Sequence, residues 1–209
     1  RDTLGAQFIQ FIPIVERTGS AALPYYHQGG DDVTERSVKP EKWGSFLTTI
    51  FDEWRSRDVG EVFVQGFDGI VANALGMYTL CVHAPECGNA LAVEHNGDVY
   101  SCDHYVEPGH LVGNVRTHAF ADIVASPQQR QFGRNKRTGL TEQCRTCPVR
   151  WACHGGCPKD RFARSASGEE GHNYLCEGYF KFFTHIAPTI EEMAALLSSG
   201  RAPAEVMGR

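Results

Sequence analysis

All eight cysteines of this 209-residue chain lie in one stretch, and the residues before it contain none. Consecutive cysteines are separated by five, fourteen, forty-one, two, five, three and eighteen residues. A pair separated by two residues can bind one metal ion or cluster, because the intervening turn directs both sulfurs to the same side. Eight thiolates are enough for two four-sulfur sites. In chain order the cysteines are Cys81, Cys87, Cys102, Cys144, Cys147, Cys153, Cys157 and Cys176.

Four kinds of chemistry compete for these cysteines. Disulfides are disfavoured, because the N-terminus has no charged-then-apolar signal pattern and a chain of this length can bury a core without cross-links. A redox dithiol would use two cysteines and leave six unexplained. Structural zinc and [4Fe–4S] clusters both take four thiolates, and the spacing alone leaves both open.

Composition and net charge limit the classes of binding partner that the chain is expected to have. Hydrophobic residues make up 42% and charged residues 22%, as in ordinary globular proteins. The net charge is −5 and no long basic run occurs, so neither nucleic acid nor an anionic membrane is the expected partner. No apolar window approaches the length of a membrane helix, and we expect a cytoplasmic protein. The chain begins at Arg1 and enters apolar sequence at once, which indicates a fragment of a longer protein.

Residues 1–78 have the pattern of alternating strands and helices. Apolar residues at 8–16 and 61–65 predict two buried strands, and a polar, glycine-containing loop is expected at 18–39. Pro40 and the aromatic and aliphatic residues that follow at spacings of three and four predict a helix over 40–57, and a weaker pattern predicts one over 67–75. This order is typical of an α/β fold.

The Cys-rich part has different signals. The Asn96-Gly97 turn between 91–94 and 98–101 predicts a β-hairpin. A helix is expected over 119–136 with a break at Ser126-Pro127, and another over 188–199 with Pro188 in its first turn. The basic side chains of Arg134, Lys136 and Arg137 are expected on a solvated face.

The cysteine spacing resembles the SPASM module of radical S-adenosylmethionine enzymes and, more narrowly, is similar to that of anaerobic sulfatase-maturating enzymes. The supporting strings are Ser-Cys-Asp-His-Tyr at 101–105 and Trp-Ala-Cys-His-Gly-Gly-Cys-Pro-Lys at 151–159. The resemblance also takes in 8–13 and the C-terminal segment to 203, and so covers essentially the whole chain. It implies the last βα units of a partial (β/α)6 barrel in 1–78, an α+β SPASM domain with a hairpin and two four-cysteine sites in 79–185, and a C-terminal helix and tail in 186–209.

In that family the SPASM module holds two auxiliary [4Fe–4S] clusters with crossed ligation. The resemblance implies that Cys81, Cys87, Cys102 and Cys157 hold the first cluster. It implies that Cys144, Cys147, Cys153 and Cys176 hold the second. With every ligand position filled, neither cluster has an open iron, which favours electron transfer or structural support over substrate ligation.

The resemblance also implies a reaction, the oxidation of a serine or cysteine of a sulfatase to formylglycine. Asp103 stands where the family has its proposed general base. By itself, a carboxylate directly after a strand more often caps a turn. Gln10 lies in a strand where family members contact S-adenosylmethionine or substrate, which is weak evidence. His83, His104, His154 and His172 could complete mixed zinc sites, but eight cysteines already fill two sites; Trp151 and Tyr105 are expected to cover a cluster or simply to belong to the core.

The radical-generating cluster of such enzymes needs a CxxxCxxC motif. Cys153 and Cys157 begin like one, but Asp160 occupies the third position. We therefore expect an incomplete and inactive portion of an enzyme whose full length adds a third [4Fe–4S] cluster and S-adenosylmethionine, with a flavodoxin or ferredoxin as electron partner. Two alternatives remain: a SPASM enzyme that forms thioether or carbon–carbon bonds in another peptide, and a non-catalytic zinc-binding module.

Overall fold

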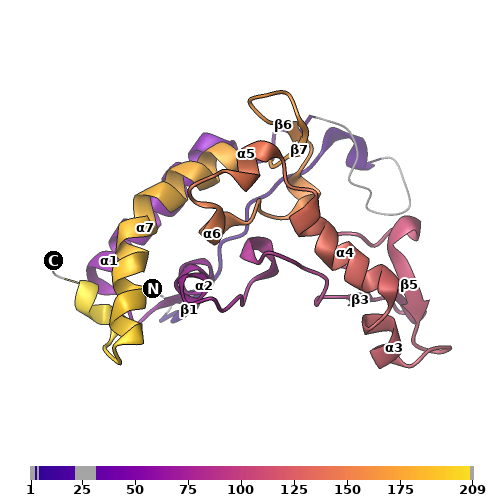
Figure 1. The fold of residues 1–209 in the computed structure, drawn as a ribbon, viewed down its shortest axis with the longest axis horizontal. Helices are drawn as coiled ribbons and strands as arrows, with labels where there is room; N and C mark the ends of the chain where they lie inside the picture. Colours follow the sequence, from indigo (N-terminus) through magenta and orange to yellow (C-terminus); the bar gives the residue numbers. More distant parts are fainter. Residues whose placement is uncertain (1–2, 4, 22–31, 208–209) are drawn as a thin grey trace.

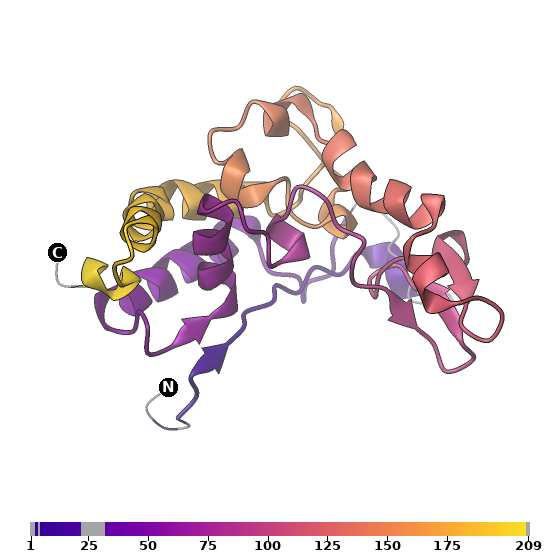
Figure 2. The same ribbon diagram turned by 60° about the horizontal axis from the view of Figure 1, so that its bottom comes forward.

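The computed structural model describes residues 3, 5–21 and 32–207. Two long helices, α1 (Pro40–Arg57) and α7 (Cys176–Ser198), lie side by side at one end of the molecule, and a small sheet lies at the other (Figure 1). The cysteine-bearing loops and short helices connect the two ends, as the rotated view in Figure 2 shows. Short 3-10 turns occur at Thr18–Ala21, Cys81–His83, Pro108–His110, Pro158–Asp160 and Pro203–Val206.

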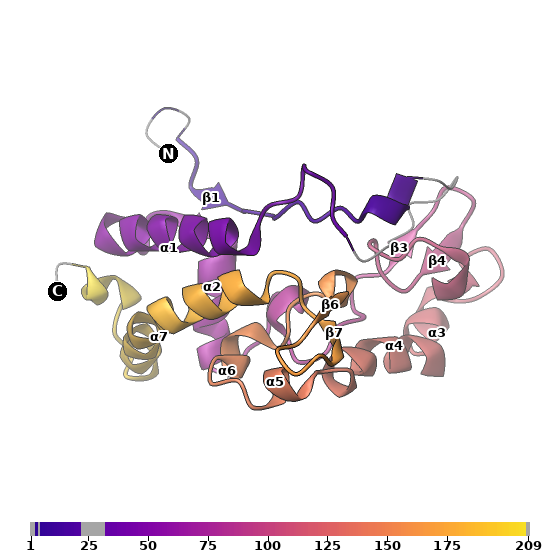
Figure 3. The same ribbon diagram turned by 90° about the horizontal axis from the view of Figure 1, so that it is seen from above.

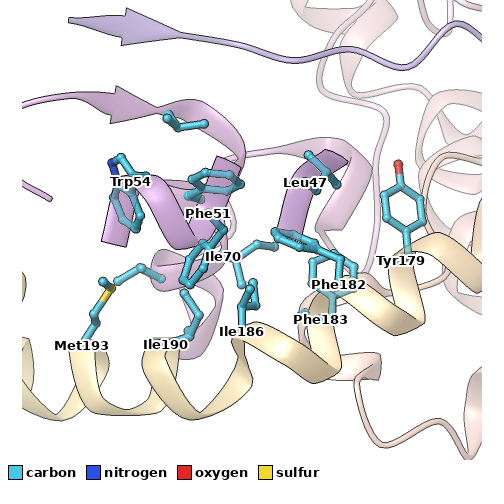
Figure 4. Packing of buried hydrophobic residues seen from close by; sticks show 14 of the residues in the cluster. Leu47, Phe51, Trp54, Ile70, Tyr179, Phe182, Phe183, Ile186, Ile190 and Met193 are labelled. Atoms are coloured by element: carbon cyan, nitrogen blue, oxygen red, sulfur yellow. The ribbon is translucent and has the colours of Figure 1, made fainter. Parts of the chain in front are cut away.

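Helix α1 has the predicted bounds, 40–57, with Pro40 in its first turn. It crosses α7 closely because glycines meet at the contact: a Cβ on Gly44 would lie 2.6 Å from the carbonyl oxygen of Gly178. The hydrophobic core, part of which Figure 4 shows, forms around the contact of α1 with α7. In it the rings of Phe51, Phe67 and Phe182 make edge and tilted contacts. The contact also fixes the start of α7, where Cys176 lies.

The first segment is a parallel βαβ unit. Strand β1 (Phe8–Ile9) pairs in parallel with β2 (Phe63–Val64), and α2 (Gln65–Ala74) follows β2 directly. Both strands are shorter than predicted, and β1 ends before Gln10. The apolar run 8–16 is also not the buried strand that the sequence predicts, since Phe8, Ile12 and Ile14 are exposed. Beyond β1 the chain bonds to a loop instead, since the amide of Val38 donates to the carbonyl oxygen of Ile14 at 2.9 Å. Residues 22–31 of the expected 18–39 loop lie outside the described residues.

A three-stranded antiparallel sheet forms the opposite end. Strands β3 (Ala92–Val93), β4 (Asp98–Tyr100) and β5 (Leu111–Asn114) are neighbours in that order, and the turn between β3 and β4 contains Asn96 and Gly97, the latter with φ 90°. Helices α3 (Phe120–Val124) and α4 (Pro127–Thr138) follow, separated where the sequence predicts a break. The Ser126 hydroxyl caps α4 by accepting a hydrogen bond from the Gln129 amide at 3.1 Å.

The remaining elements are short, and the two helices among them each carry a cysteine. They are α5 (Glu142–Arg145), α6 (Arg150–Cys153), β6 (Ala163–Arg164) and β7 (Glu170–His172), with β6 and β7 antiparallel. Figure 3 shows them grouped between α7 and α4. Among the described residues, no helix has the length and apolar character needed to cross a membrane.

The C-terminal helix differs from the prediction. It does not begin at Pro188 but at Cys176, and Pro188 lies inside it. Proline within a helix costs about 3 kcal/mol because it removes a hydrogen bond and crowds the preceding turn. Buried apolar residues on both sides of the proline offset this cost: Tyr179, Phe182, Phe183 and Ile186 before it, and Ile190, Met193 and Leu196 after it. The helix therefore runs across the expected domain boundary at 185/186.

Candidate metal centre

All eight cysteines are free thiols, and several stand at the ends of elements. Cys81 begins a 3-10 turn, Cys153 ends α6 and Cys176 begins α7. At such positions a side chain can turn out of its element toward a shared site.

Four cysteines from distant parts of the sequence, Cys81, Cys87, Cys102 and Cys157, are coupled electrostatically, as the pKa shifts of three of them show. Burial is the main reason why the pKa of Cys87, Cys102 and Cys157 is raised, to about 12 for Cys102 and Cys157. The thiolate of Cys81 adds to the pKa shifts of Cys87 and Cys157, and the thiolate of Cys157 adds to that of Cys102. Tyr105 faces the same group, since burial and three of these thiolates raise its pKa. The fold thus gathers Cys157 with the three cysteines that precede it by more than fifty residues.

The other four cysteines form a second group and line one cavity of about 580 Å³. Burial, followed by the thiolates of Cys176, Cys144 and Cys147, raises the pKa of Cys153 to about 12. Burial and the thiolates of Cys144 and Cys147 raise that of Cys176 to about 11. The resemblance assigns each of these groups of four to one cluster, and that assignment stays a prediction. Thiols with raised pKa values bind metal by releasing their protons, so binding here is coupled to proton release.

The two metal chemistries differ in the separation of the sulfurs that they require. Tetrahedral zinc, with Zn–S bonds of about 2.3 Å, holds its sulfurs about 3.8 Å apart. Within the described ranges, which include all eight cysteines, no three cysteine sulfurs lie within 4.8 Å of one another. A four-iron cluster binds each thiolate through a different iron and holds the sulfurs farther apart. Each set of four thiols can supply the ligands of a [4Fe–4S] cluster or of a structural zinc ion.

One face of α4 contacts the backbone next to cysteines of the first group, which consists of Cys81, Cys87, Cys102 and Cys157. Residues 129, 133 and 136 lie on the same side of the helix, four and three residues apart. The buried side-chain amide of Gln129 donates through Nε2 to the carbonyl oxygens of Gly88 at 2.7 Å and Ser101 at 3.0 Å. These two residues are the neighbours of Cys87 and Cys102 in the sequence. Gly133 packs against the backbone of Cys87.

Lys136 completes this face and overturns the expected solvated position. Its side chain is fully buried, with 1% of the residue exposed. The ammonium donates to the carbonyl oxygens of Cys81 at 2.6 Å and Val82 at 3.1 Å, and also to that of Ala84. Burial is the main reason why its pKa falls to about 8. The sequence carries no clear signal for this role, because Lys136 stands between Arg134 and Arg137, which are both exposed.

Asp103 follows Cys102 and is largely exposed. Its carboxylate accepts a hydrogen bond from the Cys102 thiol at 3.1 Å and lies 3.0 Å from Nδ1 of His104. Burial acts to raise the pKa of Asp103, but the bond from Cys102, the charge of His104 and backbone hydrogen bonds together lower it. The carboxylate is therefore ionised at neutral pH. When Cys102 binds metal as a thiolate it no longer donates, and the carboxylate gains a free lone pair.

Gln10 lines a separate cavity of about 540 Å³ between β1, β2 and α2. Gln65 and Asp68 line it too, and neither was predicted from the sequence. Burial raises the pKa of Asp68 to about 6. A partly buried carboxyl group in a cavity is a frequent feature of functional sites.

The four histidines are placed differently. His83 is a core residue between the rings of Tyr179 and Phe183, and burial lowers its pKa to about 3. Nδ1 of His104 and Nδ1 of His172 lie 3.7 Å from the sulfurs of Cys102 and Cys144, respectively. The ring of His154 packs edge-on against Tyr78.

Comparison with known proteins gives the following. Residues 81–148 match the family model of SPASM, an iron–sulfur cluster-binding domain. The chain is 44% identical to a serine-type anaerobic sulfatase-maturating enzyme of Bacteroides thetaiotaomicron, over 98% of this chain and 51% of that protein. It is 28% identical to a cysteine-type anaerobic sulfatase-maturating enzyme of Clostridium perfringens, over 90% of this chain and 49% of that protein.

Solved structures of such an enzyme are also similar to this chain. Native anSMEcpe with bound AdoMet superposes with a TM-score of 0.72 at 28% identity, covering 90% of this chain and 49% of that one. The same protein with AdoMet and the Cp18Cys peptide gives a TM-score of 0.73 at 27% identity, covering 91% and 51%. The expected resemblance to this group of enzymes is confirmed, and the chain spans about half the length of the relatives it matches.

Proposed function

We propose that this chain is the part of an anaerobic sulfatase-maturating radical S-adenosylmethionine enzyme that carries two auxiliary [4Fe–4S] clusters. The first cluster is held by Cys81, Cys87, Cys102 and Cys157, and the second by Cys144, Cys147, Cys153 and Cys176. The observation that carries the proposal is that thiolates within each set raise one another's pKa values, and that the second set lines one cavity. Residues 81–148, which hold five of the eight cysteines, are similar to an iron–sulfur cluster-binding domain.

The reaction of the whole enzyme is the oxidation of a serine or cysteine of a sulfatase to formylglycine. It removes a hydrogen atom from Cβ, a proton from the hydroxyl or thiol, and one electron. Bound clusters supply an electron acceptor or relay for the last of these. With serine the reaction gives the aldehyde directly, whereas with cysteine it gives a thioaldehyde, which water converts to the aldehyde with release of hydrogen sulfide. The similarity to serine-type and cysteine-type enzymes supports the reaction and leaves both residues as substrates.

Asp103 is the proposed general base. Its carboxylate is exposed, so that a polypeptide can reach it, and ionised, so that it can accept a proton. It stands next to Cys102, which places the proton acceptor beside a cluster ligand and therefore beside the route of the electron. The reaction needs both to leave the same substrate side chain.

The cavity at Gln10 is the proposed place where this chain contacts S-adenosylmethionine or the substrate peptide. It adjoins the parallel strands that we assign to a partial (β/α)6 barrel. The chain contains no CxxxCxxC motif. We assign that motif, with its third cluster, to the remaining half of the enzyme, and we expect this chain alone to be inactive.

The proposed partners are a sulfatase polypeptide and a flavodoxin or ferredoxin, in the cytoplasm. The test is to incubate the full-length enzyme with S-adenosylmethionine, a reductant and sulfatase peptides that carry serine or cysteine, and to follow the product by mass spectrometry. Formylglycine is the expected product. A thioether or carbon–carbon cross-link in a different peptide, with no formylglycine, would contradict the proposal.

A further inference from the structure

Three consecutive residues connect the two cysteine groups. Cys153 belongs to the second group and Cys157 to the first, and only His154, Gly155 and Gly156 lie between them. All three have left-handed backbone conformations, with φ of 47°, 76° and 61°. A run of such residues is costly unless its surroundings hold it in place, above all at His154, which has a Cβ.

The guanidinium of Arg161 holds this loop. Its Nε donates to the carbonyl oxygen of Gly155 at 3.0 Å, and its Nη2 donates to those of His154 at 3.0 Å and Gly156 at 3.4 Å. One side chain thus bonds every carbonyl of the connection. Its Nη1 donates to the carbonyl oxygen of Lys136 at 2.6 Å, which ties the loop to the end of α4. The planar fork of arginine suits this task, whereas the single ammonium of lysine does not reproduce it.

The charge of Arg161 is directed at both groups. All four of these hydrogen bonds go to neutral carbonyl oxygens rather than to carboxylates. The guanidinium interacts with the thiolates of Cys144 and Cys153 in the second group and with those of Cys157 and Cys87 in the first. Lys136 differs, because Cys87, Cys157 and Cys81, all of the first group, are the thiolates that act on it.

We propose that Arg161 is a positioning residue shared by the two clusters: it fixes the loop that joins them, and its charge stabilises the reduced form of both. Reduction adds a negative charge to a cluster, so a fixed cation nearby raises its reduction potential. Arg161 thereby raises both potentials together. This inference rests on the proposed function, since it requires iron–sulfur clusters at both groups.

The test compares Arg161→Met, Arg161→Lys and Lys136→Met with the parent chain after anaerobic reconstitution, by iron and sulfide analysis and a redox titration followed by electron paramagnetic resonance. Arg161→Met is expected to shift both midpoint potentials to more negative values, and Lys136→Met only one. Arg161→Lys, which keeps the charge, is expected to return both potentials toward those of the parent. The exposed Arg130, on the same helix as Lys136, provides the control Arg130→Met, with both potentials unchanged.

A shift of only one potential, or of neither, in iron-loaded Arg161→Met would overturn the inference alone. If Arg161→Met does not retain iron, Arg161→Gln takes its place, because it is neutral and keeps an amide donor for the loop: a shift of both potentials to more negative values supports the inference, and a shift of only one, or of neither, contradicts it. Zinc without sulfide in the parent chain would refute the proposed function and this inference together.

Discussion

The backbone carbonyl of Cys87 lies directly against Gly133 of α4, so close that a methyl group at position 133 would overlap its oxygen. The amide of Cys87 also donates to the carbonyl oxygen of Gly133 at 3.4 Å. The position of Cys87 in the first site therefore requires glycine at position 133, forty-six positions further along the chain.

Gly133→Ala is expected to displace Cys87 and to lower the iron content of the reconstituted chain by about four atoms, one cluster's worth. Overpacking of this kind also destabilises the fold by about 1–3 kcal/mol. Gly66→Ala is the matched control, because Gly66 is a helical glycine with open space at its Cβ position. Equal iron contents in the two variants would contradict the role of Gly133.

Asp103→Asn is expected to keep both clusters and abolish formylglycine formation in the full-length enzyme, because the amide keeps the shape of the carboxylate but cannot accept the substrate's proton. The measurements are iron content and the mass of the product peptide. Asp122→Asn, at an exposed carboxylate in α3, should change neither. Unchanged turnover in Asp103→Asn would remove Asp103 as the base.

Asp68→Asn is expected to stabilise the chain more at pH 8 than at pH 5. Burial raises the pKa of Asp68 from 3.8 to about 6, so the folded chain binds more protons between these values. The associated stability is fully present below pH 3.8 and is lost as the pH rises through 6. Asparagine is never charged and escapes this loss, a gain of about 1 kcal/mol at pH 8 after allowance for the partial exposure of the side chain. Denaturant unfolding measures it, and an equal gain at both pH values would argue against a buried carboxyl group.

Cys157→Ala is expected to lower the iron content by more than one cluster's worth. It removes a ligand of the first site and also releases one end of the loop that leads to Cys153 of the second. Cys102→Ala is the comparison, since it removes a ligand of the same first site from a part of the chain with no such link. Equal losses of one cluster in both variants would show that the two sites are independent.

The sequence predicts α1 correctly because its apolar residues recur at spacings of three and four and Pro40 marks its start. It does not predict the start of α7, because Pro188 indicates a boundary when read locally. Only the packing of residues such as Phe182 and Ile190 against α1 and α2 carries the helix through the proline.

The cysteine sites, too, could be predicted only in part from the sequence. Spacing indicates four-sulfur sites and the resemblance supplies their pairing, but the residues that position the cysteines leave little trace in the sequence. Lys136 resembles a surface lysine next to Arg137, and its burial depends on three carbonyl oxygens from a turn more than fifty residues away. Such tertiary contacts are invisible to periodicity.

The most direct measurement is the amount of iron, zinc and acid-labile sulfide per chain after anaerobic purification and reconstitution. The account predicts about eight irons and eight sulfides, as two [4Fe–4S] clusters on eight cysteines require. About two zinc ions with no sulfide, as two Cys₄ zinc sites require, would contradict it.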